Sequence, residues 1–172
     1  KGVATFNQPL GQWNVSGVRN MSWMFNEATA FNQPIEGGDT SRVSTMTFMF
    51  MRATAFNQPL GQWNVSGVMN MRSMFSRAAT FNQPLGQWNV SRVKDTSSMF
   101  YIAPAFNQPL ERWNVSGVTD MAFMFNDAIA FNQPLERWDV SGSNLIISMF
   151  QGSGMTQIPS WYKEGSTHPV IY

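Results

Sequence analysis

The sequence predicts an α/β solenoid, a right-handed stack of six 25-residue coils with a parallel β-sheet on one side and short helices on the other. A phenylalanine opens each copy of a repeated phrase at intervals of 25 residues, at Phe6, Phe31, Phe56, Phe81, Phe106 and Phe131. A Met-Phe pair recurs at the same interval, and six copies pass without an insertion or deletion. A period this strict indicates one structural unit per repeat, stacked on its neighbours.

The first half of each repeat has the spacing of a β-strand. In the third copy, "LGQWNVS" places Leu60, Trp63 and Val65 in an L-x-x-L-x-L arrangement. The alternation of a strand turns Trp63 and Val65 inward and leaves Asn64 and Ser66 facing solvent. We therefore expect parallel strands of successive coils about 4.8 Å apart, joined into one sheet.

The second half of each repeat has the spacing of a short helix. In "MRSMFSRA", Met71, Met74, Phe75 and Ala78 stand at i, i+3, i+4 and i+7, which is one apolar face of a helical turn. The "FNQP" that follows predicts a corner, because its proline ends the helix and its asparagine pairs with local backbone groups.

The recurring aromatic positions are expected to form the core. No single coil buries its apolar side chains alone, so stability depends on stacking. The predicted core residues are Trp13, Trp63, Trp88, Trp113, Trp138, Phe25, Phe50, Phe75, Phe100 and Phe125. Residues 1–153 form the six-coil domain, and residues 154–172, where the period stops, form a C-terminal cap or a connection. Since "KGVAT" is in register with the end of a further copy, we expect the chain to come from a longer array.

Three departures interrupt the pattern. Gly38 stands where the other copies have tryptophan, so Trp23 or Phe48 must fill its space or leave a cavity. Thr96 replaces a methionine in the fourth copy. The sixth copy loses a valine at Ser143 and an alanine at Ser153, as expected of a terminal repeat.

The phrase "FNQPLGQWNVSGV" followed by M-x-x-M-F resembles the repeat of about 25 residues in bacterial surface proteins related to the BspA-like leucine-rich-repeat proteins. The resemblance covers residues 3 to about 153. It implies a leucine-rich-repeat-like solenoid in an extracellular or cell-surface protein that acts in adhesion or protein binding. It carries no set of catalytic residues to this chain.

Catalysis is not expected, because an enzyme places unique groups at one spot and this chain repeats the same groups in every copy. The single histidine, His168, lies outside the repeats, and Glu136 and Asp139 have nothing that marks them as an acid–base pair. Cysteine is absent, so thiolate metal sites and disulfides are excluded. We expect no metal and no cofactor. A net charge of +1 gives no reason to expect nucleic acid. No apolar run reaches the ~20 residues of a membrane span, so this segment is not expected to insert into a bilayer.

The outward side chains of the expected sheet are the candidate binding face. They are Gln12, Asn14, Ser16, Asp39, Arg42, Gln62, Asn64, Ser66, Gln87, Asn89, Arg92, Arg112, Asn114, Arg137 and Asp139. The structural alternative is that the asparagines and serines hydrogen-bond to one another and to turn backbone. A calcium ladder is disfavoured, because only Asp39 and Asp139 of the asparagine row are anionic. The "NVS" sequences are glycosylation sequons only if the chain is secreted by a eukaryote.

These observations predict a non-catalytic module that binds a protein or a glycan at a cell surface through the sheet face, with its anchor in segments outside this chain. The alternative is a structural spacer or a fibre-forming subunit of a surface layer. Residues 40–94 carry six basic and no acidic side chains, whereas residues 95–139 carry six acidic and two basic ones. Such polarity is consistent with self-association or with neutral variation on a solvated face.

Overall fold

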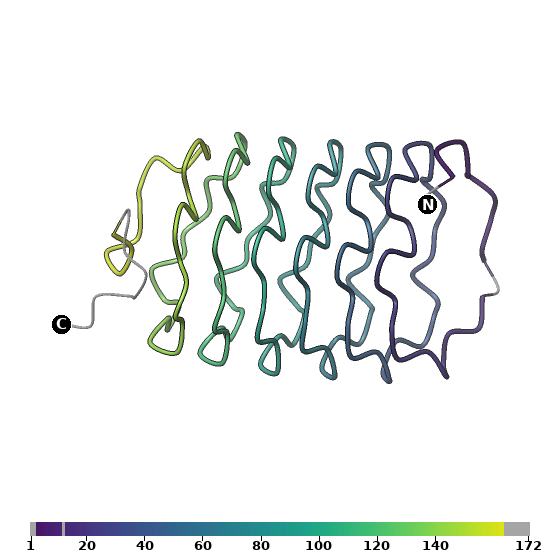
Figure 1. Cartoon of the computed structure of the whole chain (residues 1–172), viewed down its shortest axis with the longest axis horizontal. Coiled ribbons are helices and arrows are strands. Elements are labelled where there is room, and N and C mark those ends of the chain that lie inside the picture. The colour runs from purple at the N-terminus through teal and green to yellow at the C-terminus, as the bar shows by residue number, and fades with distance from the viewer. Residues whose placement is uncertain (1–2, 12, 164–172) are drawn as a thin grey trace.

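The computed structural model describes residues 3–11 and 13–163. The chain winds as successive coils that lie side by side along one long axis, with the first and the last described coils at opposite ends (Figure 1). Isolated parallel bridges join equivalent residues of neighbouring coils, Asn20 to Thr45, Thr45 to Asn70, Asn70 to Asp95, Asp95 to Asp120 and Asp120 to Leu145. Each bridge spans one 25-residue period, so one repeat makes one coil.

The α/β prediction is wrong. The described residues contain no helix, and their only β-structure is these isolated bridges, so neither the parallel sheet nor the covering helices of a leucine-rich-repeat-like solenoid exist. No described segment is a helix long and apolar enough to cross a membrane. The coils are built instead from successive turns, and backbone hydrogen bonds link each coil to the next at only part of its circumference.

The expected helix is a run of overlapping β-turns, which we call the turn segment (residues 71–78 and their equivalents). The amides of residues 74, 76 and 78 donate to carbonyls three residues earlier, at 3.1–3.2 Å. The amides of residues 71, 73, 75 and 77 donate to carbonyls of the next coil, at 2.8–2.9 Å. Every second amide is therefore used within the coil, and the rest hold the stack together.

Coil spacing explains why a helix does not form. Along the column of Phe50, Phe75 and Phe100, ring centroids are 5.5 and 5.7 Å apart. Packed helices need about 8–10 Å between their axes, so a helix in every coil does not fit this stack. An i, i+3, i+4, i+7 pattern is equally satisfied by consecutive turns, which also leave amides free to bond between coils.

The turns require residues in the left-handed region. Ser73 and Arg77 have φ of 52° and 58°, and the equivalent residues of the other described coils are also positive. A positive φ at the third position is the geometry of a type II turn, where glycine is usual. Each non-glycine residue there costs about 1–2 kcal/mol, which the bond from the same amide to the next coil helps to offset.

The expected strand consists of two separate turns. Trp63 N donates to Leu60 O at 3.1 Å, and Val68 N donates to Val65 O at 2.9 Å. No backbone-to-backbone hydrogen bond joins residues 61–67 to a neighbouring coil. Trp63 and Val65 are nevertheless buried and Asn64 is exposed, so the predicted inward and outward positions are correct although the sheet is absent.

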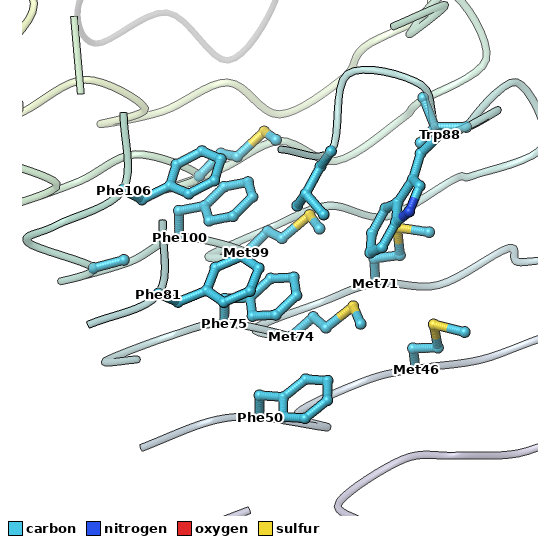
Figure 2. Close-up of a cluster of buried hydrophobic side chains, with 14 of the residues drawn as sticks. Met46, Phe50, Met71, Met74, Phe75, Phe81, Trp88, Met99, Phe100 and Phe106 are labelled. Atoms are coloured by element: carbon cyan, nitrogen blue, oxygen red, sulfur yellow. The ribbon is translucent and has the colours of Figure 1, made fainter. Parts of the chain in front are cut away.

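The core is a set of aromatic columns that run along the stack (Figure 2). One column passes through Phe75 and Phe100, and a second passes through Phe81 and Phe106. Phe75 stacks on Phe81 at 4.0 Å and Phe100 on Phe106 at 3.8 Å, so each coil adds one rung between the columns. Tryptophans form a further row, in which Trp88 Nε1 donates to Leu60 O of the preceding coil at 2.9 Å.

The "FNQP" corner contains an asparagine ladder. Asn82 Oδ1 accepts the backbone amide of Asn107 at 2.9 Å and the side-chain amide of Gln108 at 3.0 Å. The same bonds recur from coil to coil, and the acceptors are Asn7, Asn32, Asn57, Asn82 and Asn107. The asparagine therefore pairs with the neighbouring coil, which gives a structural reason for the identical corner in all six copies.

The space at Gly38 is filled from the first coil. Trp23 and Phe48, which the sequence suggested for this role, stack on each other with centroids 4.0 Å apart. Trp13 instead lies 5.9 Å from Phe25 and 6.4 Å from Trp63, which are the neighbours a tryptophan at position 38 would have.

The C-terminal end of the stack is covered by a shortened seventh turn. Trp161 stacks on Trp138 at 6.5 Å and donates from Nε1 to Leu135 O at 3.0 Å, as the repeat tryptophans do. Thr156 N donates to Asn132 Oδ1 at 3.0 Å and so ends the asparagine ladder. The remainder of the predicted cap, residues 164–172, lies outside the described residues.

Candidate binding surface

The predicted binding face forms local turns. Asn64 Oδ1 accepts the amide of Ser66 at 3.1 Å and its hydroxyl at 2.7 Å, and Asn14, Asn89 and Asn114 bind Ser16, Ser91 and Ser116 in the same way. The two rows thus hydrogen-bond within each coil rather than along the stack. These asparagine side chains are exposed, but their acceptor oxygens are engaged in stabilising the turn.

The two aspartates in this row behave in the same manner. Asp39 Oδ1 accepts the backbone amide of Ser41 at 3.0 Å, and that bond holds the pKa of Asp39 below its ordinary value. The pKa of Asp139 is also lowered, first by the side chain and then by the backbone amide of Ser141. Both carboxylates are therefore stabilised in the charged form by a neighbouring serine.

The remaining predicted face residues lie apart from these turns on the exposed surface. Gln62, Gln87, Arg42, Arg92 and Arg112 are exposed, and Gln12 lies outside the described residues. Arg137 Nε lies 3.2 Å from Glu111 Oε1 across neighbouring coils. The structure arranges these residues in rows along the stack but forms no enclosed site from them.

A different surface also varies among the repeats. We call it the turn face, and it consists of three rows of side chains on the turn segments. The first row is Trp23, Phe48, Ser73, Ser98, Phe123 and Ser148; the second is Asn26, Met51, Ser76, Tyr101, Asn126 and Gln151; the third is Glu27, Arg52, Arg77, Ile102, Asp127 and Gly152. By contrast, the corner asparagine, glutamine and proline are identical in all six copies.

Neighbouring coils pair their side chains across the turn face. Trp23 stacks on Phe48, and Arg52 Nη1 lies 2.8 Å from Glu27 Oε1. Further along, the Arg77 guanidinium lies over the Tyr101 ring, 5.6 Å from its centroid. These contacts fix the exposed aromatic side chains against their neighbours and reduce the entropy that they lose on binding a partner.

A shallow cleft of about 420 Å³ opens on the turn face between the fourth, fifth and sixth coils. It is lined by Ser98, Tyr101, Phe123, Asn126 and Gln151. Phe123 is 39% exposed, whereas Asn126 is only 7% exposed. Asn126 Nδ2 donates to Ser148 O at 3.2 Å and to Gln151 Oε1 at 3.5 Å.

A second cleft, of about 460 Å³, lies at the N-terminal end of the stack. Its lining includes Phe6, Leu10, Trp13 and Met24, which are apolar core positions of the first coil. The buried Trp13 Nε1 has no hydrogen-bond partner there. The residues that line this cleft are apolar, so it offers no set of polar side chains for catalysis.

The residues considered for catalysis do not converge. Glu136 accepts hydrogen bonds from the hydroxyl and the amide of Ser160, and these bonds lower the pKa of its carboxyl. Asp139 is bonded to Ser141 instead, and His168 lies outside the described residues. Within residues 3–11 and 13–163, no group of three or more metal-binding side chains forms.

The turn face could have been recognised from the sequence. When the Met-Phe segment is interpreted as a core helix, the variable positions between its apolar residues are given no role. Their change from Trp23 to Ser73 to Phe123 within a fixed register is the pattern expected of a surface on a rigid scaffold.

The stacked coils and their variable turn face define a repeat protein. A family model described as "Mycoplasma protein of unknown function, DUF285" matches residues 1–106 and 80–164. Together these matches cover most of the chain, and the chain belongs to this family. No curated protein and no solved structure has significant similarity to the chain.

Proposed function

We propose that the chain is a non-catalytic binding module of a cell-surface protein and that it recognises a glycan or a protein through its turn face. The observation that carries the proposal is the contrast between the rows. Side chains change from coil to coil on the turn face, while the "FNQP" corner and the Asn-Val-Ser turn stay nearly constant. A constant scaffold that carries variable side chains suits recognition better than catalysis.

The proposed location at the cell surface rests on sequence resemblance. The repeat phrase resembles those of bacterial surface proteins, and we propose that the two share an origin related to the BspA-like proteins. The relationship is one of repeat sequence, because this chain lacks the sheet of a leucine-rich repeat. An anchor outside residues 1–172 would hold the module at the surface.

A structural spacer or fibre-forming subunit of a surface layer is the second candidate, and the charge distribution along the stack favours it. Residues 40–94 carry six basic and no acidic side chains, whereas residues 95–139 carry six acidic and two basic ones. Such polarity suits association between copies of the chain.

One pair of measurements distinguishes the two functions. The 172-residue chain is applied to arrays of glycans and extracellular proteins, and its mass is measured by light scattering over a range of concentrations. As a matched control, Trp23, Phe48 and Phe123 are replaced together by serine, which the chain itself carries in this row at Ser73, Ser98 and Ser148. Array binding that the control loses supports the module. Filaments or a mass that rises with concentration, without any array binding, would overturn it in favour of the spacer.

A further inference from the structure

The coils of the stack are evenly spaced. Successive ring centroids in the core column from Phe25 to Phe150 lie 5.4–5.9 Å apart. Figure 1 shows these coils side by side along one long axis. Two copies that pack face to face and antiparallel about a twofold axis therefore stay in step from coil to coil, and each row of the turn face meets the same row of the other copy.

The third row of the turn face carries charges of both signs. Glu27 in the first coil is paired with Arg52 in the second. Asp127 in the fifth coil is exposed and forms no ion pair within the described part of the chain. Arg77 in the third coil is exposed, and its guanidinium lies over the Tyr101 ring rather than beside a carboxylate. The row therefore offers one guanidinium and one carboxylate, two coils apart, for an ion pair with another molecule.

These charges favour one antiparallel register. With the twofold axis at the fourth coil, the third coil of each copy faces the fifth coil of the other, and Arg77 meets Asp127 twice. With the axis at the third coil, Arg77 faces its own copy and Glu27 faces Asp127, so both contacts bring like charges together. With the axis between these coils, Arg77 faces Ile102 instead. A parallel twofold arrangement places the third row against the first row, which has no charged side chain.

Side-chain size favours the same register. With the axis at the fourth coil, Phe123 lies opposite Ser73 of the second copy, and Phe48 lies opposite Ser148. Phe123 is 39% exposed and Ser73 is 6% exposed, so a projecting ring faces a recessed serine. On the axis, Ile102 faces the same residue of the second copy. An axis between the third and fourth coils would place Phe48 against Phe123, with two bulky rings in one space.

We propose that two copies of the chain pack antiparallel through their turn faces, about a twofold axis at the fourth coil, with Arg77 of each copy beside Asp127 of the other. This inference rests on the turn face as the recognition surface of the proposed function, and it names a second copy of the chain as the protein partner. The same surface is used on both copies, so the assembly closes at two chains. It differs in this respect from the open assembly of a fibre subunit.

Exchange of the two charges tests the contact, with the mass of the 172-residue chain measured by light scattering over a range of concentrations. Arg77→Glu and Asp127→Arg each bring like charges together and should raise the dissociation constant of the dimer about tenfold or more. The double variant restores an opposite pair and should dimerise nearly as the unmodified chain does. Glutamate and arginine already occur in this row, at Glu27 and Arg52, so the stack accepts both changes, which thermal unfolding checks. Arg19→Glu changes the net charge equally at an exposed residue outside the three rows, and this control should dimerise normally.

A single introduced cysteine tests the register, because the chain has no cysteine of its own. Ile102→Cys places two thiols at the twofold axis, and a short bismaleimide should link them into a covalent dimer. Met69→Cys is the matched control, since Met69 is an apolar residue that is 47% exposed outside the three rows. It should remain a single chain under the same conditions.

The expected result is a mass that levels at two chains, a dimer that both charge variants weaken, and linkage at position 102 only. A mass that keeps rising, a dimer that Arg77→Glu leaves unchanged, or equal linkage of the two cysteine variants would overturn the proposal. A constant mass of one chain together with binding on the glycan and protein arrays would also overturn it, while leaving the proposed function intact. A constant mass of one chain without array binding would overturn both.

Discussion

The indole of Trp13 occupies the space beside Gly38, where a Cβ on the glycine would lie 2.8 Å from Trp13 Nε1 and 2.8 Å from Val15 Cγ2. Trp13 belongs to the first coil but takes the place of the tryptophan missing from the second. The missing side chain of one repeat is therefore replaced by a side chain of its neighbour.

This relationship predicts strong coupling between the two positions. Gly38→Trp alone should lower the free energy of unfolding by about 1–3 kcal/mol, because the new indole overlaps Trp13. Trp13→Ala alone should also destabilise the chain by removing the indole that fills the gap. The double variant should recover stability relative to the sum of the single changes, by about 0.5–3 kcal/mol.

Chemical denaturation of all four chains of this cycle measures the coupling. Trp88→Ala paired with Gly38→Trp is the control, because Trp88 is a tryptophan of the fourth coil with no role beside Gly38 and the two changes should be additive. Additive behaviour of Trp13→Ala and Gly38→Trp would show that Trp13 does not fill the gap at position 38.

The asparagine ladder predicts a specific loss at the "FNQP" corner. Asn82→Ala removes the acceptor for the Asn107 amide and for the Gln108 side chain. Leaving a partly buried amide unpaired should lower the free energy of unfolding by about 1–3 kcal/mol. Hydrogen exchange should show the Asn107 amide exchanging faster, while the amides of the turn segment change less.

The matched variant for this position is Asn82→Asp, which keeps an acceptor oxygen at the same place. It should retain protection of the Asn107 amide and lose less stability than Asn82→Ala. Equal losses for the two variants would mean that the oxygen of Asn82 does not carry the stabilisation.

The period, the buried aromatic positions and the corner could be predicted because each depends on residue type at a fixed spacing. The secondary structure could not, because the spacing of Met71, Met74, Phe75 and Ala78 suits both a helix and a run of turns. Coil separation decides between them, and it is a property of neighbouring repeats that no single repeat reveals. The positive φ of Ser73 and Arg77 could not be predicted either, since neither residue is glycine.

The candidate binding face stays a prediction, but its polar rows are arranged differently from those of a sheet. Asn64 is exposed and binds Ser66 within one turn, which is the structural alternative that the sequence offered for these rows. The sequence also did not predict that Trp13 fills the space at Gly38. Trp13 packs against Phe25 and Trp63, which lie 25 residues further along the chain than the neighbours that the repeat pattern assigns to position 13. The secondary structure could not be predicted where amides of the turn segment bond to the next coil, because one repeat does not reveal its neighbour's position.

Gly152 is the one described glycine whose φ is positive, at 69°. Gly152→Ala should destabilise the chain by about 1–2 kcal/mol from backbone strain alone. A Cβ there would also collide with Asp127 Oδ1, which adds to the loss. Gly17→Ala is the control, because no atom lies within 4 Å of its added Cβ, and it should leave the melting temperature nearly unchanged. Similar melting temperatures for the two variants would contradict the turn geometry assigned to the sixth coil.

The last prediction concerns Asp120, whose pKa is raised above its ordinary value of 3.8, first by burial and then by the nearby Asp95 charge. The unfolded chain releases this proton at a lower pH than the folded chain does. The folded state therefore loses stability as pH rises from about 3.8 through the raised pKa, and the loss persists at neutral pH. Asp120→Asn removes the charge but keeps an acceptor oxygen for Ala122 N. Asn70 occupies the equivalent position two coils earlier, and its Oδ1 accepts the amide of Arg72 at 2.9 Å.

Asp120→Asn should accordingly be more stable than the unmodified chain at pH 7, and the difference should shrink below about pH 4. Asp139→Asn provides a control of opposite sign, because the serine hydrogen bonds lower the pKa of Asp139. Its variant should be less stable at pH 7, and this difference should also close as the pH falls through the lowered folded-state pKa. Urea unfolding at pH 7 and near pH 3 measures both differences. A loss of stability at pH 7 in Asp120→Asn would mean that the hydrogen bond to Ala122 outweighs the burial of the charge.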